Sequence, residues 1–174
     1  MKEVNSPKNG NNNIFITGFM GSGKTTVGRA LAKKLGKKFI DLDLAIEDFM
    51  EKRISEVIEE FGIEYFRKIE NQQLAVMCKE RDAVISLGGG SLISENNQYQ
   101  VKKSGHLIFL MAEEKTLINR LEKSHVRPLL KTKGFYELFE ERRRGYMRAD
   151  LSIRTDDFAP EKIVDVVIQE IDSL

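Results

Sequence analysis

The sequence predicts an α/β domain built on a doubly wound, five-stranded parallel sheet with helices on both faces. Three observations support this fold class. Five short apolar segments alternate with segments of helical periodicity, which is the pattern of βαβ units. Stretches rich in glycine or aspartate follow three of the apolar segments, where the ligand sites of such sheets lie. A chain of 174 residues also has the size of one domain with a substantial core.

Each expected element rests on a local pattern. The strands are expected at residues 14–17, 38–42, 83–87, 106–111 and 151–154. Gly36 is expected to end the first helix, and Pro160 suits the first turn of the last helix. The apolar stripe of the first helix consists of Val27, Ala30, Leu31 and Leu35. That of the last helix consists of Ile163, Val164, Val167, Ile168 and Ile171.

The composition indicates a soluble globular protein, with 41% hydrophobic and 32% charged residues. Residues 1–13 are expected to form a disordered arm, and residues 14–174 a single domain. The net charge of +1 and the lack of a long apolar stretch give no reason to expect a nucleic acid or a membrane as partner. The only cysteine, Cys78, is expected to be an inert buried thiol. We therefore expect a cytoplasmic monomer.

A phosphate loop directly follows the first strand. Residues 18–25, Gly-Phe-Met-Gly-Ser-Gly-Lys-Thr, fit the pattern G-x-x-x-x-G-K-[ST] between a buried strand and a helix. Glycines let the backbone N–H groups surround a phosphate, while Lys24 would reach the β- and γ-phosphates and Thr25 would hold Mg²⁺. An ordinary glycine turn is the alternative, but it does not explain a Lys-Thr pair in register. The loop predicts a nucleoside triphosphate site and a fold of the P-loop NTPase type.

Two aspartates follow the second strand. Asp41 and Asp43 are two residues apart, so on an extended segment both side chains would face the same way. One could hold Mg²⁺ near Thr25 through water, and the other could orient an attacking hydroxyl or accept its proton. The alternative is a solvated strand end at which Asp43 caps a helix over residues 44–50. The neighbouring phosphate loop favours the functional interpretation.

Two further features bear on the question of a bound acceptor. Arg67 and Glu70 are spaced i, i+3, and this spacing alone favours a surface ion pair over an arginine fork aimed at a carboxylate ligand. Gly88, Gly89 and Gly90 follow the third strand, where three glycines indicate backbone pressed against a small ligand, with a flexible loop as the alternative.

The last candidates are arginines. Arg127 could reach over the phosphates from a closing lid, or it could be a surface residue before a turn proline. The run of residues 140–144, Glu-Glu-Arg-Arg-Arg, is typical of a charged helix face, and its spacing does not single out one arginine. Its acidic members argue against a nucleic-acid surface.

These motifs, in this order, resemble the shikimate kinase family from about Ile14 to the C-terminus. The resemblance rests on the phosphate loop, the Asp41-Leu42-Asp43 element, the helix segment 66–70, the glycine triplet and the segment 127–130. It implies transfer of the ATP γ-phosphoryl group to the 3-hydroxyl of shikimate, a step of aromatic amino acid and chorismate biosynthesis.

The resemblance also implies roles for individual residues. Mg²⁺ would lie at Thr25 with Asp41 nearby, and Lys24, Asp43 and Arg127 would be catalytic. ATP would contact Gly21, Ser22, Gly23, Lys24, Thr25, Thr26, Arg120, Arg127 and Pro160. Shikimate would contact Asp43, Arg67, Gly88, Gly89, Gly90 and Arg142.

The resemblance further implies two moving parts, an acceptor-binding segment over residues 43–70 and a lid over residues 124–134. The chain departs from the family pattern after Arg142, where Ala149-Asp150 comes one residue early, so Arg143 is the alternative clamp. Two other functions remain open: a kinase of the same fold for another small acceptor, such as gluconate or a nucleoside monophosphate, and a nucleotide-dependent switch without enzymatic activity.

Overall fold

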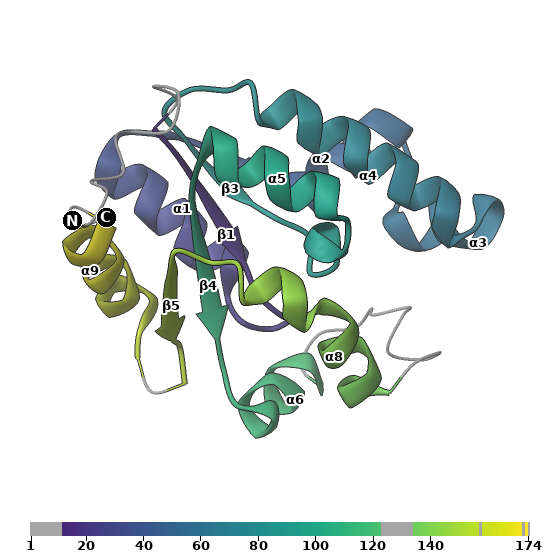
Figure 1. The fold of residues 1–174 in the computed structure, drawn as a ribbon. Helices are drawn as coiled ribbons and strands as arrows, with labels where there is room; N and C mark the ends of the chain where they lie inside the picture. The colour runs from purple at the N-terminus through teal and green to yellow at the C-terminus, as the bar shows by residue number, and fades with distance from the viewer. Residues whose placement is uncertain (1–11, 123–133, 157, 172, 174) are drawn as a thin grey trace.

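A computed structural model describes residues 12–122, 134–156, 158–171 and 173 of the chain. Its sheet has five parallel strands in the order β2-β3-β1-β4-β5 (Figure 1). The strands are β1 (Asn13–Thr17), β2 (Lys38–Asp41), β3 (Ala83–Ser86), β4 (Gly105–Met111) and β5 (Leu151–Arg154). The predicted α/β fold class is therefore confirmed.

The strands are connected by helices, as parallel strands require. The described helices are α1 (Lys24–Leu35), α2 (Leu42–Met50), α3 (Ile54–Phe61), α4 (Ile63–Met77), α5 (Glu95–Ser104), α6 (Glu114–Glu122), α8 (Phe135–Tyr146) and α9 (Pro160–Ile171). A 3-10 turn, η2 (Ser91–Ile93), follows the glycine triplet. Among the described residues, every helix is too short or too polar to span a bilayer.

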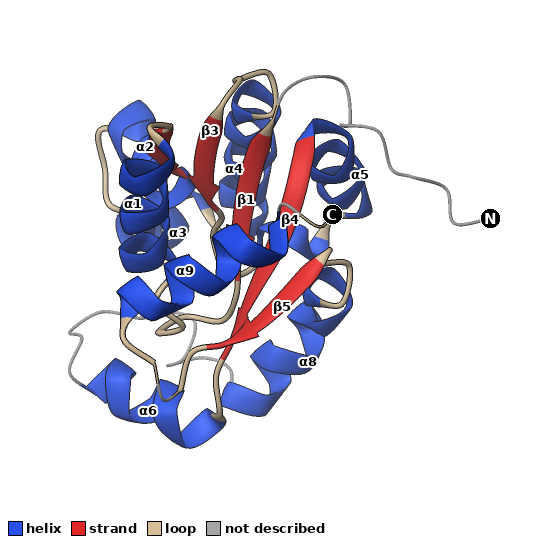
Figure 2. Cartoon of the chain, turned by 90° about the vertical axis from the view of Figure 1, so that its left-hand side faces the viewer, coloured by secondary structure: helices blue, strands red, loops and turns tan. Residues whose placement is uncertain are grey.

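The sheet is covered on both faces, and successive residues of β1 point to opposite sides. Ile16 belongs to an apolar cluster with Leu31 of α1 and Val164 of α9. Phe15 belongs to a second cluster, with Ile69 of α4 and Val101 of α5. Figure 2 shows α1 and α9 in front of the sheet, with α4 behind it. This double cover matches the mostly buried, apolar inner strands β1, β3 and β4, and leaves the strand ends as the place for polar chemistry.

The predicted helix ends are also confirmed. Gly36 ends α1 with φ of 65°, and its N–H points back to the carbonyls of Ala32 and Lys33. This left-handed geometry is the one that glycine adopts without a steric penalty. Pro160 is the first residue of α9, as expected.

The first strand begins one residue earlier than predicted. Asn13 is fully buried, and its side chain donates to the Glu80 carbonyl at 2.7 Å and accepts from the Ala83 N–H at 3.0 Å. Asn13 also pairs with Gly105 of β4, so it belongs to β1 and not to the expected arm. Residues 1–11 of the expected arm lie outside the described residues.

The second strand ends one residue earlier than predicted, which corrects the interpretation of Asp41 and Asp43. Leu42 already belongs to α2, because the Asp41 side chain accepts hydrogen bonds from the N–H groups of Asp43 and Leu44, at 3.1 and 3.5 Å. Asp41 is thus the N-cap, a role that the alternative interpretation gave to Asp43. The two aspartates do not share an extended segment, and the argument from strand alternation was wrong.

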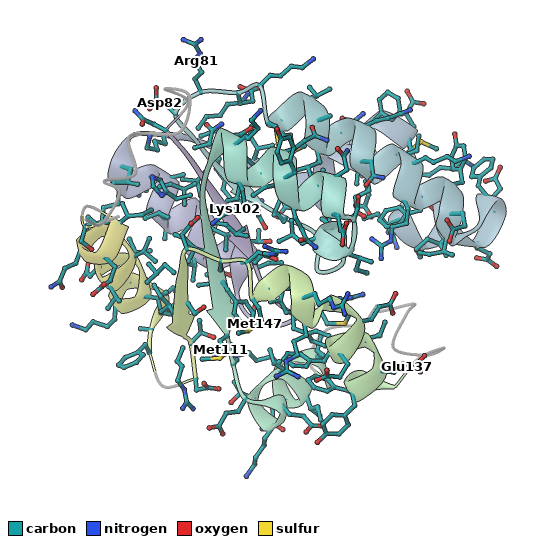
Figure 3. All side chains as sticks on the ribbon, in the orientation of Figure 1. Arg81, Asp82, Lys102, Met111, Glu137 and Met147 are labelled. Carbon is teal, nitrogen blue, oxygen red and sulfur yellow. The ribbon has the colours of Figure 1, made fainter. Side chains whose placement is uncertain are left out.

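The candidate functional residues gather at the carboxyl end of the sheet. In Figure 3, Arg81 and Asp82, which precede β3, lie at the opposite end of the sheet from Met111, the last residue of β4. A third apolar cluster lies beyond the ends of the strands, where Phe19 and Phe109 pack with Leu117 of α6 and Leu138 of α8. This cluster anchors the loops that build the site described below.

Candidate active site

The phosphate loop folds as a tight turn into α1. The Ser22 N–H donates to the Phe19 carbonyl at 3.1 Å, and the Val27 N–H donates to the Gly23 carbonyl at 2.9 Å. Gly18 is required by sterics, since a Cβ there would lie 2.6 Å from the Leu110 carbonyl oxygen of β4. The loop therefore lies directly against the sheet and opens at the N-terminus of α1, where an anion is favoured.

The Lys24 side chain arches back over this loop. Its ammonium group donates to the carbonyls of Gly18 and Phe19, at 3.0 and 3.2 Å. The charge is therefore held above the residues whose N–H groups would surround a phosphate, and close to the acceptor side of the loop. This placement suits a cation that bridges phosphate groups.

A hydroxyl and a carboxylate stand side by side next to Lys24. Thr25 Oγ1 donates to Asp41 Oδ2 at 2.7 Å. These hard oxygen donors fit Mg²⁺, which takes few protein ligands and completes its shell with phosphate and water. No cluster of three or more acidic, histidine or cysteine side chains occurs within the described part of the chain, so the donor set does not suit a metal caged by protein alone.

A cavity of about 440 Å³ opens beside the phosphate loop. Arg120 and Pro160 line it, as does Phe158. Arg120 is fixed by bonds to the Thr155 carbonyl at 2.8 Å and to the Gly21 carbonyl at 3.3 Å. The predicted nucleotide residues that line this cavity are Gly21, Ser22, Gly23, Lys24, Thr25, Thr26, Arg120 and Pro160.

A second cavity, also of about 440 Å³, lies on the other side of Lys24. Its charged wall includes Arg67, whose guanidinium lies 2.5 Å from Glu70. Glu70 is only 1% exposed and accepts a further hydrogen bond from the Ser91 hydroxyl at 2.7 Å. The ion pair is therefore not a surface pair, which is what the i, i+3 spacing alone favoured. Spacing could not reveal that η2 and the glycine loop cover this face of α4.

The glycine triplet is explained by close approach. A Cβ at Gly88 would lie 2.7 Å from Asp43 Oδ1, one at Gly89 would lie 2.9 Å from an Arg142 nitrogen, and one at Gly90 would lie 2.5 Å from an Arg67 nitrogen. Three functional side chains thus press against three successive residues of the loop. The close approach at the glycines is therefore to these side chains, and the expected contact between the loop and a small ligand stays a prediction.

Arg142 and Arg143 differ sharply in environment. Arg142 is 3% exposed, lies over the Phe19 ring at 5.4 Å and lines the acceptor cavity. Its Nε has no hydrogen-bond partner among the described residues. Arg143 points to solvent and pairs with Glu140 at 3.4 Å. A buried guanidinium that faces a cavity is costly unless an anion accompanies it. Arg142 is therefore the better anion receptor.

Several lining residues were missed by the sequence analysis. Ile54 and Ile58, on one face of α3, form with Phe66 an apolar wall of the acceptor cavity. Their i, i+4 spacing could have suggested this, but the same spacing is typical of core residues. No sequence signal pointed to Thr155, whose backbone holds Arg120. Arg127 and residues 124–133 of the expected lid lie outside the described residues.

Lys24 and Asp43 line both cavities. The cavity at the phosphate loop and the cavity lined by Arg67 and the buried Arg142 therefore meet at one ammonium and one carboxylate. A phosphate chain in one cavity and an anionic ligand in the other would therefore meet at Lys24 and Asp43.

Comparison with known proteins identifies the family. The model of the shikimate kinase family matches residues 20–172. The chain belongs to the shikimate kinase family. A relative from Sulfurihydrogenibium sp. named shikimate kinase is 38% identical over 161 residues, which cover 91% of this chain and 97% of the relative. A relative of the same name from Persephonella marina is also 38% identical, over 91% of this chain and 98% of the relative.

Solved structures of the family agree with the fold. The shikimate kinase of Acinetobacter baumannii, determined in complex with shikimate, superposes with a TM-score of 0.88 at 30% identity, covering 93% of both chains. That of Aquifex aeolicus gives a TM-score of 0.82 at 32% identity, covering 92% of this chain and 96% of the other. A gluconokinase from Sinorhizobium meliloti shares the fold only, with a TM-score of 0.59 at 16% identity. Membership of the family makes the chain an ATP-dependent small-molecule kinase.

Proposed function

We propose that this protein transfers the γ-phosphoryl group of ATP to the 3-hydroxyl of shikimate and yields shikimate 3-phosphate. The observation that carries the proposal is the meeting of two cavities at Lys24 and Asp43, with Arg67 and the buried Arg142 on the acceptor side. The shikimate bound to the Acinetobacter baumannii relative supports the choice of acceptor. The product serves aromatic amino acid biosynthesis through chorismate.

The nucleotide belongs in the cavity at the phosphate loop. Its phosphates lie against the N–H groups of residues 21–26, and its adenine lies between Arg120 and Pro160. Thr25 and Asp41 would hold Mg²⁺, Asp41 through water, and the ion would supply neutralisation of the phosphate charge. The cytoplasm, where ATP is available, is the proposed location, and the proposed working form is a monomer.

Shikimate belongs in the second cavity, with its carboxylate between Arg67 and Arg142. Both guanidinium groups reach the glycine triplet, at Gly90 and Gly89 respectively, so the carboxylate lies beside that backbone. The apolar wall of Ile54 and Phe66 suits the carbon ring. Because Arg142 is buried, a neutral polyol would leave its charge without a partner, and this discriminates against uncharged polyols.

Asp43 and Lys24 act where the two ligands meet. Asp43 accepts a hydrogen bond from the attacking hydroxyl and takes its proton as the bond to phosphorus forms. Lys24 neutralises the charge on the transferring group, and catalysis comes mainly from this positioning and charge balance. Arg127 is proposed to approach the phosphates from the lid, and closure of residues 43–70 over the acceptor would keep out water.

The test is an ADP-release assay with purified protein, ATP and Mg²⁺, run with and without shikimate, with gluconate as a matched acceptor. We expect shikimate to raise the rate of ADP release by orders of magnitude, and gluconate to leave it at the rate of slow hydrolysis. Equal stimulation by gluconate would support a kinase for another acceptor. No stimulation by either, with ATP still bound, would overturn the proposal in favour of a nucleotide switch.

A further inference from the structure

Tyr146 is a buried tyrosine whose hydroxyl reaches the glycine triplet. It is the last residue of α8 and is 1% exposed. Its ring stacks on Phe109 of β4, with 4.9 Å between centroids and 12° between planes. Its hydroxyl donates to the Gly89 carbonyl at 2.7 Å. The ring is therefore fixed by packing, and its polar atom is directed at the middle residue of the loop.

This hydroxyl remains a donor over the whole working range of pH. Burial raises the pKa of Tyr146 to about 12, although the positive charge of Arg142, a hydrogen bond between Arg142 and the Tyr146 hydroxyl, and the positive charge of Arg67 oppose the rise. The phenol is thus protonated at neutral pH, and its hydrogen is available to the Gly89 carbonyl.

The Gly89 carbonyl is held differently from its two neighbours. The Gly88 carbonyl accepts from the Ser91 N–H at 3.2 Å, and the Gly90 carbonyl accepts from the Ile93 N–H at 3.1 Å. Both bonds are local to the loop and η2, whereas the bond to Gly89 comes from a helix 57 residues away. Three consecutive glycines have wide backbone freedom, so this bond restricts the peptide that would otherwise turn most easily. Because the peptide is planar, it also fixes the direction of the Gly90 N–H.

Tyr146 and the clamp arginine come from the same helix. Arg142 and Tyr146 are spaced i, i+4 and therefore share one face of α8. That face is pressed against η2, since a Cβ at Gly145 would lie 2.5 Å from the Leu92 carbonyl oxygen. A Cβ at Gly89 would in turn lie 2.9 Å from Arg142. One face of α8 thus positions both the Arg142 guanidinium and the Gly89 peptide beside it.

We infer that Tyr146 is a positioning residue for the acceptor: through Gly89 it sets the geometry between the glycine backbone and Arg142 into which the acceptor carboxylate docks. The inference rests on the proposed function and extends it to a residue that touches neither substrate. It predicts that loss of the hydroxyl alone weakens acceptor binding and leaves nucleotide binding unchanged.

The test is the variant Tyr146→Phe, which keeps the stacked ring and removes the hydroxyl. We expect the KM for shikimate to rise about 5- to 30-fold, the effect of one lost buried hydrogen bond, with the KM for ATP within about twofold of wild type. Calorimetric titration with shikimate should show the same weakening, and titration with ATP none. Tyr99→Phe is the matched control, because Tyr99 is 60% exposed on α5 and should change neither constant.

Two results would overturn the inference. A lower unfolding temperature with an unchanged KM for shikimate would reduce the bond to a purely structural one. An equal rise of both KM values would indicate general loosening of the site. Either result with an active wild type would leave the proposed function intact. A wild type that is not stimulated by shikimate would overturn the function, and the inference with it.

Discussion

Thr25 Oγ1 and Asp41 Oδ2 lie 2.7 Å apart, and the other oxygen of the same carboxylate caps the helix that carries Asp43. Asp41 therefore serves two sites with its two oxygens. One oxygen accepts from Thr25 at the proposed Mg²⁺ site, and the other fixes the first turn of α2, from which Asp43 reaches the acceptor cavity. The position of the Asp43 carboxylate is thus coupled to the proposed metal site through the Asp41 side chain.

Substitutions of Asp41 should separate these two tasks. Asp41→Asn keeps a good N-cap but loses the charge, so the Mg²⁺ concentration for half-maximal rate should rise about 10- to 100-fold with little change in the free energy of unfolding. Asp41→Ala should show the same Mg²⁺ effect and also lose about 1 kcal/mol of stability. Mg²⁺ titration of the rate and chemical denaturation measure the two effects. An unchanged Mg²⁺ requirement in both variants would remove Asp41 from the metal site.

Lys24→Ala should abolish turnover and leave the fold intact. The Lys24 side chain lines both cavities and its ammonium donates to the carbonyls of Gly18 and Phe19, so on its removal water from the cavities can replace these bonds at little cost in stability. The kcat should fall by roughly 10²-fold or more, since a charge placed at the transferring phosphoryl group is lost. Steady-state kinetics and the unfolding temperature are the measurements. Appreciable residual activity in a folded variant would contradict the role of Lys24.

Arg67→Ala should affect the acceptor far more than the nucleotide. Arg67 lines the acceptor cavity but not the cavity at the phosphate loop, and it is held by the buried Glu70. We expect the KM for shikimate to rise about 100-fold and the KM for ATP to change less than about twofold. Arg67→Lys keeps the charge without the planar fork and should recover only part of the loss. Equal effects on both KM values would move Arg67 away from the acceptor.

The sequence was most informative where a residue type has a strict geometric meaning. The Lys-Thr register of the phosphate loop, Gly36 and Pro160 each indicated the observed local structure, because few alternatives satisfy the same backbone requirements. It was misleading at Asp41 and Asp43, because strand and helix both accommodate two aspartates two residues apart, and only the cap bonds decide. It could not place Glu70, Tyr146 or Thr155, whose surroundings come from segments distant in the chain.

The buried Cys78 thiol predicts a pH-dependent contribution to stability. Burial raises its pKa to about 11 from the usual 9.0, although a hydrogen bond with Ser104 opposes the rise. The folded state holds the thiol proton up to about pH 11, while the unfolded chain loses it near pH 9. The contribution is therefore complete below pH 9 and is lost between pH 9 and 11.

This contribution can be isolated by comparison with Cys78→Ala. As the pH rises from 8 to 11, wild type should lose roughly 2–3 kcal/mol of unfolding free energy relative to Cys78→Ala. Denaturant unfolding at a series of pH values measures it, and the shared titration of lysines and tyrosines cancels in the difference. A constant difference over this range would mean that the thiol is not shielded from solvent.

The two neighbouring arginines of α8 give a matched pair of variants. Arg142 is buried beside Gly89 and over the Phe19 ring, whereas Arg143 is exposed and paired with Glu140. Arg142→Ala should raise the KM for shikimate about 100-fold, because it removes a desolvated partner of the carboxylate. Arg143→Ala should change it by less than about twofold, since an exposed i, i+3 pair contributes only a few tenths of a kcal/mol.

The direct readout is calorimetric binding of shikimate, with binding of ATP as the check on folding. Arg142→Ala should weaken shikimate binding about 100-fold and retain ATP binding, because Arg142 is absent from the lining of the nucleotide cavity. If Arg143→Ala weakens shikimate binding and Arg142→Ala does not, the clamp is Arg143, and α8 would have to turn about its axis when the acceptor binds. If both variants bind shikimate like wild type, the carboxylate does not dock between α8 and the glycine triplet, and the assignment of the second cavity fails.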